Sequence, residues 1–187
     1  MSESTPGRST YNGGKTRVTD SSVLSSKLTP QDLQDLLALL PTMVPAERQT
    51  LLQKLQKFEE LQARETAQTD FLSFVGRMWP EFIMGRHHKK MARAFERVAN
   101  GKCKRLIINM PPRHTKSEFA SYLLPAWFLG RFPQKKVIQT SHTEELAVGF
   151  GRKVRNLVGQ DIYVDLFPDT ALQADSKAAG RWNTSKG

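Results

Sequence analysis

The first 70 residues consist of a polar stretch followed by two segments with helical periodicity. Residues 1–28 are rich in Ser, Thr and Gly and show no apolar periodicity, which predicts a flexible tail. Pro30 and Pro45 then open two segments in which apolar residues recur every three or four positions. We expect a helical hairpin, or arm, over 29–68. It packs on its own domain or on a neighbouring subunit, or it binds a specific partner. Its apolar positions are Leu33, Leu36, Leu37, Leu40, Leu51, Leu55, Phe58 and Leu61.

Two further helices are predicted between residues 70 and 101. Asp70 or Thr69 can cap a helix over 71–78, which is followed by Trp79-Pro80. Residues 87–99 have the spacing of a second helix, and Asn100-Gly101 provides the left-handed turn that commonly ends one. The apolar face of this second helix consists of Met91, Phe95 and Val98.

The periodicity changes after residue 104. Two compact apolar runs are typical of buried strands in a parallel sheet, and each is followed by a segment with helical spacing. Strand, helix, strand, helix is the order of elements in an α/β fold. We expect the strands at 105–110 and 137–140 and the helices at 118–130 and 141–158.

The pattern weakens toward residue 187. Ser141 and Glu144 have capping-box spacing at the start of the last predicted helix. Beyond residue 159, the segments 162–167 and 171–182 have the character of short strands or loops. A typical sheet has roughly five to six strands, whereas only two are secure here. The sequence therefore predicts an incomplete parallel sheet in residues 69–187.

Charge changes this picture because it is concentrated in the later part of the chain. The protein has 28 Lys+Arg and 18 Asp+Glu, a formal net charge of +10. Residues 71–187 hold 20 of the basic and 9 of the acidic side chains, so residues 1–70 are nearly neutral. A polyanionic partner is therefore expected to bind the later part, although a solvated basic face accounts equally for the charge.

The composition also limits the classes of protein that fit. The apolar runs are too short to cross a bilayer, and the first residues lack the apolar stretch of a secretory signal peptide. The single cysteine, Cys103, has no internal partner for a disulfide and fits a reducing compartment. His87 and His88 are adjacent but have no cysteine or carboxylate close by in the sequence, which makes a poor metal site.

The stretch Met110-Pro111-Pro112-Arg113-His114-Thr115-Lys116-Ser117 carries the most chemical information. It lies between a predicted strand and a predicted helix, where backbone N–H groups can bind a phosphate. Lys116 is followed by the hydroxyl of Ser117, as in loops that bind a nucleotide with Mg²⁺. The two usual glycines are replaced by Pro111 and Thr115, so a basic strand-to-helix turn without a ligand is the alternative.

This stretch resembles the variant Walker A loop of the large terminase subunit of tailed bacteriophages, a DNA-packaging ATPase. The resemblance extends from about Phe74 through Arg-His-His-Lys-Lys and Gln-Thr-Ser-His-Thr to Gly180-Arg181-Trp182-Asn183. It implies a P-loop NTPase-type parallel sheet preceded by an N-terminal helical arm, with ATP and Mg²⁺ as cofactors. It also implies a location in the cytoplasm of the bacterial host, at the procapsid.

The resemblance assigns roles to matched positions. Lys116 would neutralise the β- and γ-phosphates, Ser117 would coordinate Mg²⁺, and Arg113 would sense or stabilise the γ-phosphate. Pro112, His114 and Thr115 would complete the cofactor-binding loop, which His114 would shape by packing or hydrogen bonding. Adenine contacts in the family lie near the stretch 79–88, which has no glutamine here, so Trp79 and His88 are the candidates, with His87 as a further one.

Double-stranded DNA is the implied macromolecular partner, with the portal protein, the small terminase subunit and a homo-oligomeric ring implied by the family. A packaging motor grips the DNA backbone without reading bases, which requires only Lys and Arg contacts. The candidates are Arg152, Lys153 and Arg155, on a helix whose buried stripe would be Leu146, Phe150, Val154 and Leu157.

Two features of the family are missing from the sequence. The first is an apolar strand ending in Asp and Glu, which the segment ending at Asp165 resembles only weakly. The second is the carboxylate cluster of the nuclease. We therefore expect a fragment of a terminase large subunit with little activity alone. The alternative is a non-catalytic DNA-binding or assembly module with a vestigial loop, and a small nucleotide or metabolite kinase ranks below both.

Overall fold

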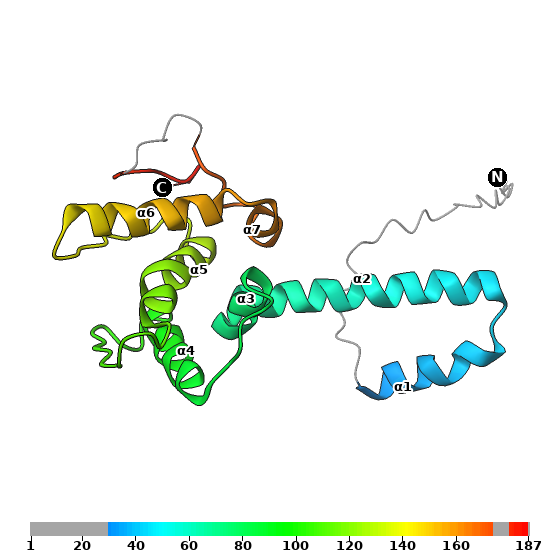
Figure 1. Cartoon of the computed structure of the whole chain (residues 1–187). Coiled ribbons are helices and arrows are strands. Elements are labelled where there is room, and N and C mark those ends of the chain that lie inside the picture. Colours follow the sequence, from blue (N-terminus) through cyan, green and yellow to red (C-terminus); the bar gives the residue numbers. More distant parts are fainter. Residues whose placement is uncertain (1–29, 174–179, 187) are drawn as a thin grey trace, which may run out of the picture. The chain divides into compact units, whose positions relative to one another are not determined.

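The computed structural model describes residues 30–173 and 180–186, and its regular structure is almost entirely helical (Figure 1). The predicted tail over 1–28 lies outside these residues. The elements in chain order are α1 (Pro30–Leu39), the short 3-10 helix η2 (Leu40–Thr42), α2 (Pro45–Thr69), α3 (Phe71–Met78), α4 (Arg86–Ala99), the π-helical turn η3 (Glu118–Leu123), α5 (Leu124–Arg131), α6 (Glu144–Val158) and α7 (Asp161–Leu166).

The chain divides into two compact units, residues 1–51 and 52–187. The first contains α1, η2 and the beginning of α2, so both helices predicted after Pro30 and Pro45 are confirmed. Leu40 is buried in this unit, whereas Leu37 and Leu39 are more than half exposed. The apolar stripe predicted for the arm is therefore only partly covered.

The predicted α/β fold with a parallel sheet is wrong. The described residues contain no β-sheet, and their one bridge is an isolated antiparallel pairing of Leu172 with Thr184. The segments 105–110 and 137–140 belong to no helix or strand, and Ile107 and Ile138 are 85% and 88% exposed. An extended apolar segment becomes a sheet strand only when neighbours satisfy its backbone groups, and helices bury the core here instead.

A cluster of aromatic side chains forms the core of the unit 52–187. Phe71 is fully buried at its centre, with its ring centroid 5.3 Å from Phe95, 5.6 Å from Phe119 and 5.4 Å from Trp127. The edge-to-face angles of these pairs match the favoured geometry of aromatic rings. These four residues come from α3, α4, η3 and α5, so a single aromatic cluster joins helices from separate parts of the sequence.

Local signals correctly predicted α3 and α4. The Asp70 carboxylate accepts a hydrogen bond of 2.7 Å from the backbone N–H of Ser73 and so caps α3. Met91 and Phe95 are buried on α4, and Gly101 adopts a left-handed φ of 72° just after this helix ends.

The later helices depart from the sequence prediction at their ends. Helix α6 is capped by Thr143, whose hydroxyl accepts from the N–H of Leu146 at 3.3 Å, so the predicted cap Ser141 is wrong. Leu146 is 42% exposed, whereas Val154 and Leu157 are buried as predicted. Helix α7 occupies most of the segment 162–167, which was predicted as a short strand or loop.

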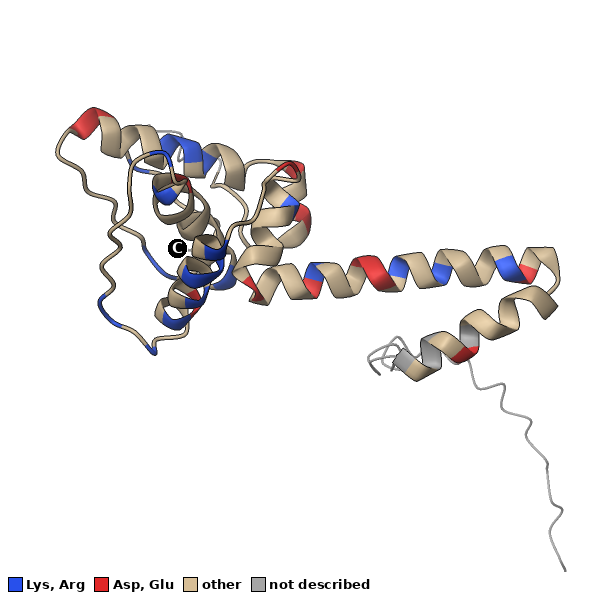
Figure 2. Ribbon diagram, turned by 60° about the horizontal axis from the view of Figure 1, so that its bottom comes forward, with Lys and Arg blue, Asp and Glu red and all other residues tan. Residues whose placement is uncertain are grey.

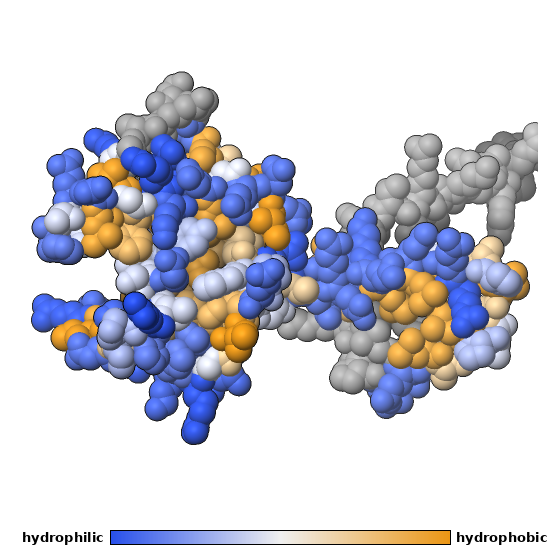
Figure 3. Space-filling model, viewed as in Figure 1, coloured by the Kyte–Doolittle hydropathy of each residue, from blue (hydrophilic) through white to orange (hydrophobic). Residues whose placement is uncertain are grey.

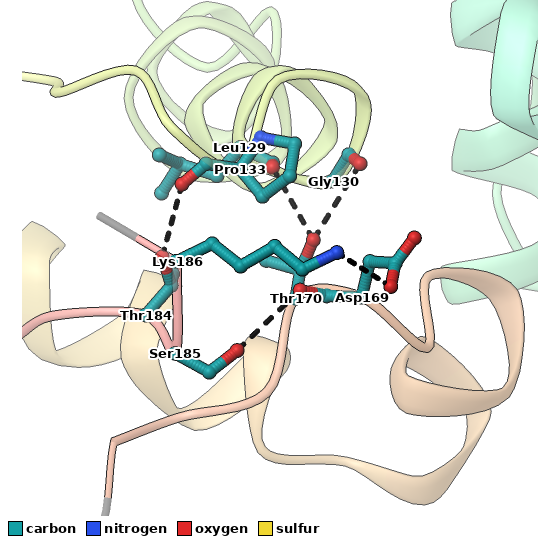
Figure 4. A network of polar contacts seen from close by, with 8 residues as sticks. All are labelled: Leu129, Gly130, Pro133, Asp169, Thr170, Thr184, Ser185 and Lys186. Atoms are coloured by element: carbon teal, nitrogen blue, oxygen red, sulfur yellow. Dashed lines mark hydrogen bonds and ion pairs between the residues drawn. The ribbon is translucent and has the colours of Figure 1, made fainter.

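A polar network fastens the residues that follow α7 to the end of α5 (Figure 4). The buried hydroxyl of Thr170 donates to the carbonyls of Leu129 and Gly130, and the hydroxyl of Thr184 donates to the carbonyl of Pro133 at 3.1 Å. Lys186 Nζ lies 2.7 Å from Asp169 Oδ1. These contacts fix residues 180–186 against the helical core.

Gly130→Ala is expected to lower the free energy of unfolding by about 1–3 kcal/mol, because overpacking forces neighbouring groups apart. An added Cβ would lie 2.5 Å from Cγ of the Phe167 ring, which is itself buried. Urea unfolding followed by circular dichroism measures this change.

Gly149→Ala is the matched control because it also lies in a helix, α6, where an added Cβ meets nothing within 4 Å. The free energy of unfolding of this control should rise by about 0.5–1 kcal/mol, because alanine has a higher helix propensity than glycine. Equal stabilisation of both variants would contradict the packing of Phe167 on α5.

Candidate functional site

The backbone of residues 113–115 has the alternation in the sign of φ that also occurs in anion-binding turns. Arg113 and Thr115 adopt left-handed φ angles of 63° and 55°, and His114 between them does not. The backbone N–H groups of residues 114–117 make no hydrogen bond to any other described residue. Alternation of left- and right-handed residues points successive N–H groups toward one side, where an anion can accept from several of them.

This loop leads directly into a helix. The N–H of Phe119 donates to the carbonyl of Thr115 at 2.9 Å, and residues 116 and 117 are already helical before η3 begins. The partial positive charge at the start of a helix favours a bound anion in this position. Short π-helical segments such as η3 often occur at functional sites.

The side chains of the loop divide into an inward and an outward set. Lys116 is half-buried, and its Nζ donates to the carbonyl of Met110 at 3.4 Å. The side chains of Arg113 and Ser117 are exposed and make no hydrogen bond or ion pair with any described residue. Pro112 is exposed as well, and its carbonyl lies 2.9 Å from Nδ1 of His114. Arg113, Lys116 and the hydroxyl of Ser117 thus lie in the same five-residue segment, 113–117, as the unpaired N–H groups.

His88 lies against the loop and is buried, with 5% of its surface exposed. Its Nδ1 accepts from the N–H of Gly85 at 2.8 Å, which places the ring proton on Nε2. Nε2 is 2.6 Å from Oγ1 of Thr115, and the Thr115 hydroxyl donates to the carbonyl of His114 at 2.7 Å. The start of α4 and the loop are therefore joined by a short chain of hydrogen bonds.

Aromatic rings enclose this histidine. Phe82 and Phe119 lie 4.7 and 4.9 Å from its ring centroid, and His87 lies 3.7 Å away. Burial lowers the pKa of His88 below its ordinary value, and the nearby His87 and His114 lower this pKa further. His88 is therefore neutral at pH 7.

The two residues proposed for adenine contacts occupy different surroundings. Trp79 is 37% exposed and packs on Phe82 at 5.1 Å, and Phe82 in turn contacts His88 and Phe119. His88 faces the loop itself through Thr115. His87 lies 5.8 Å from the ring of His114, so both histidines of the pair lie beside the loop.

The candidate DNA contacts lie on α6. Arg152 is exposed, Arg155 is half-buried, and Lys153 forms an ion pair of 3.2 Å with Glu118 at the start of η3. This ion pair brings α6 next to the helix that follows the loop. Basic side chains outnumber acidic ones in the unit 52–187 as a whole. Along α2, by contrast, basic and acidic side chains are interspersed (Figure 2).

A separate hollow of about 580 Å³ lies elsewhere in the same unit. It is lined by parts of α5 and α6, the extended segment 135–139 and residues 180–184, and none of residues 112–117 lines it. Hydrophobic residues also reach the surface of this unit (Figure 3). The most exposed of them among the described residues are Ile83, Ile107 and Ile138.

The described residues hold neither a metal-binding cluster nor a helix that could cross a membrane. No cluster of three or more His, Cys, Asp or Glu side chains there has the arrangement of a metal site. None of the helices in the described ranges combines the length and apolar character needed to cross a membrane.

The hydrogen bond between His88 and Thr115 was not predicted from the sequence. The sequence held a signal only for the other bond of this ring, since Gly85 and His88 stand at the spacing of a helix N-cap and its third residue, where a side chain can reach back to the cap N–H. Comparison of the chain with protein-family models, curated proteins and solved structures finds no match.

Proposed function

We propose that residues 112–117 bind the phosphates of ATP and that the chain is the ATP-binding portion of a viral DNA-packaging motor of the terminase type. The observation that carries the proposal is the run of unpaired backbone N–H groups at 114–117, between two left-handed residues and the start of a helix. Lys116 and Ser117 stand within this run, as in phosphate-binding loops.

Each polar side chain of the loop has a distinct part in this proposal. Lys116 leaves the carbonyl of Met110, a long hydrogen bond of 3.4 Å, and pairs with the β- and γ-phosphates. Arg113, exposed and without a partner among the described residues, pairs with the γ-phosphate. The free hydroxyl of Ser117 would hold Mg²⁺, which neutralises phosphate charge when it is bound.

The basic residues of α6 support a second part of the proposal. Arg152, Lys153 and Arg155 would contact the backbone of double-stranded DNA, and the ion pair of Lys153 with Glu118 connects their helix to the helix that follows the loop. In the packaging role this unit would work with a portal protein, a small terminase subunit and further copies of itself.

Lys116→Ala is expected to weaken the binding of ATP with Mg²⁺ by about tenfold to a hundredfold, because it removes a charged hydrogen-bond donor to phosphate. Isothermal titration calorimetry of the whole chain measures the affinity. Lys135→Ala is the matched control, since Lys135 is an exposed lysine on another segment. The affinity of this variant for ATP with Mg²⁺ should equal that of the wild type. Equal affinity of Lys116→Ala and wild type would refute the assignment of the loop.

The helical fold of the described residues favours one alternative, a DNA-binding or assembly module that does not use ATP. This alternative predicts that the chain binds double-stranded DNA with an affinity that falls steeply with salt and does not change with ATP and Mg²⁺. Fluorescence anisotropy with labelled DNA distinguishes the two candidates. A change in DNA affinity on addition of ATP and Mg²⁺, absent in Lys116→Ala, supports the motor.

A further inference from the structure

We infer that His88 is a positioning residue for the phosphate-binding loop: its neutral imidazole holds Thr115, which lies among the unpaired N–H groups of residues 114–117, in its left-handed conformation. The inference rests on the proposed function of the loop. It concerns how the loop is held and under which conditions it binds, and His88 itself does not touch the phosphates.

The direction of each hydrogen bond supports this assignment. The N–H of Gly85 can only donate, so Nδ1 of His88 accepts and Nε2 carries the proton. Nε2–H then donates to Oγ1 of Thr115, whose own hydroxyl proton is directed to the carbonyl of His114. All three bonds are satisfied together only by the neutral tautomer with the proton on Nε2.

The loop needs such a support because its backbone conformation is unfavourable. A left-handed conformation is unfavourable for a residue with a side chain and persists only where surrounding contacts impose it. Thr115 is β-branched, which makes a φ of 55° a genuine outlier. Its hydroxyl makes the two hydrogen bonds described above, one of them to the buried ring of His88.

The surroundings of His88 fix the position of its ring. Phe82 and Phe119 pack on it at 4.7 and 4.9 Å, so the ring cannot turn away without opening the core. His87 on α4 and His114 in the loop are the titratable groups that act on its charge, and both disfavour a second proton. The phenylalanines that complete the enclosure carry no charge.

Acid is therefore expected to release the loop. A proton on Nδ1 would face the N–H of Gly85, and this hydrogen bond would be lost. The folded protein prefers neutral His88, so the stability from this chain of bonds is present above about pH 6.5, the pKa of an unfolded histidine. It is lost as the pH falls through the lower pKa of the folded state. If protonation of His88 acted only through its added positive charge, phosphate affinity would rise in acid. Loss of the hydrogen bond to Gly85 instead predicts that phosphate affinity falls in acid.

Three substitutions of His88 and two of Thr115 separate the two hydrogen bonds of the ring. In His88→Gln the amide NH₂ replaces Nε2–H as the donor to Thr115 and does not titrate. In His88→Asn the amide oxygen replaces Nδ1 as the acceptor for Gly85 but the side chain is too short to reach Thr115. His88→Ala removes both bonds. Thr115→Val removes the partner hydroxyl while leaving His88 in place, and Thr115→Ser keeps the hydroxyl.

The first readout is the affinity for ATP with Mg²⁺ between pH 5.5 and pH 8, measured by calorimetry on the whole chain. At pH 8 we expect His88→Gln and Thr115→Ser to bind within about threefold of wild type, and His88→Asn, His88→Ala and Thr115→Val to lose about tenfold, the equivalent of one hydrogen bond. The ratio of wild-type to His88→Gln affinity should fall as the pH falls, and this ratio cancels the titration of ATP itself. Wild-type affinity in His88→Ala, or a ratio that rises in acid, would overturn the inference.

The second readout needs no ligand and so separates this inference from the proposed function. Nitrogen-15 NMR of the free protein should show His88 with its proton on Nε2. The amide signals of residues 114–117 should shift in His88→Ala, His88→Asn and Thr115→Val and stay in place in His88→Gln. A proton on Nδ1, or unchanged amide signals in His88→Ala, would refute the positioning role. If Lys116→Ala leaves ATP affinity unchanged while these signals shift, the proposed function fails and the positioning role stands.

Discussion

Phe71→Ala is expected to lower the free energy of unfolding by about 3–5 kcal/mol, the range found when a buried phenylalanine is truncated. The Phe71 side chain is fully buried, and its ring contacts those of Phe95, Phe119 and Trp127. Because these rings come from separate helices, the cavity cannot close by moving a single element. Single domains are stable by only about 5–15 kcal/mol, so this variant should be close to unfolding at 37 °C.

Urea unfolding measured by tryptophan fluorescence and by circular dichroism tests this prediction. Phe150→Ala is the matched control, because Phe150 is partly exposed on α6 and its truncation opens no closed cavity. We expect this control to lower the free energy of unfolding by well under half as much as Phe71→Ala does. A loss below about 1 kcal/mol in Phe71→Ala would contradict the aromatic core.

Trp127→Ala is expected to cost a similar 3–5 kcal/mol, for a partly different reason. The indole of Trp127 is fully buried, and its Nε1–H donates to the carbonyl of Ala67 at 3.2 Å. Ala67 lies in the last turn of α2, where backbone carbonyls lack partners within the helix. Truncation therefore opens a cavity and also leaves a buried carbonyl without a donor.

Trp127→Phe separates these two contributions because it keeps a ring and removes only the N–H donor and part of the volume. We expect it to cost about 1–3 kcal/mol, as for a buried acceptor left unpaired. The rings of Phe71 and Trp127 lie 5.4 Å apart, so the double variant Phe71→Ala/Trp127→Ala should cost less than the sum of the single changes. Strict additivity in a double-mutant cycle would show that the two rings do not share a core.

The elements that were predicted correctly are those specified within a few residues of sequence. Asp70 caps α3 through its own carboxylate, and Gly101 follows α4 because a left-handed residue suits glycine. Met91 and Phe95 face the core because helical spacing places them on one side of α4. Each signal acts over one or two turns of chain, which is why it can be read without a structure.

The candidate site was predicted in part. The sequence placed Lys116 and Ser117 between a strand and a helix; the helix is there and begins at Lys116 itself, whereas the strand is absent. The positive φ angles of Arg113 and Thr115 go against residue preference, since neither is a glycine, so no pattern of residue types predicts them. The support from His88 joins positions 27 residues apart and depends on how α4 packs beside the loop.

By itself, the sequence determined the approximate positions of α1 to α6, the left-handed turn at Gly101, the concentration of positive charge after residue 70 and the order of groups in the loop. It did not predict α7 or the caps of α4 and α6. It did not determine whether residues 105–110 and 137–140 form a sheet. Local preference makes a segment extended, whereas a sheet requires neighbouring strands at hydrogen-bonding distance. Only the tertiary structure decided that the core is a cluster of aromatic rings between helices, because burial of those rings depends on contacts between residues far apart in the chain.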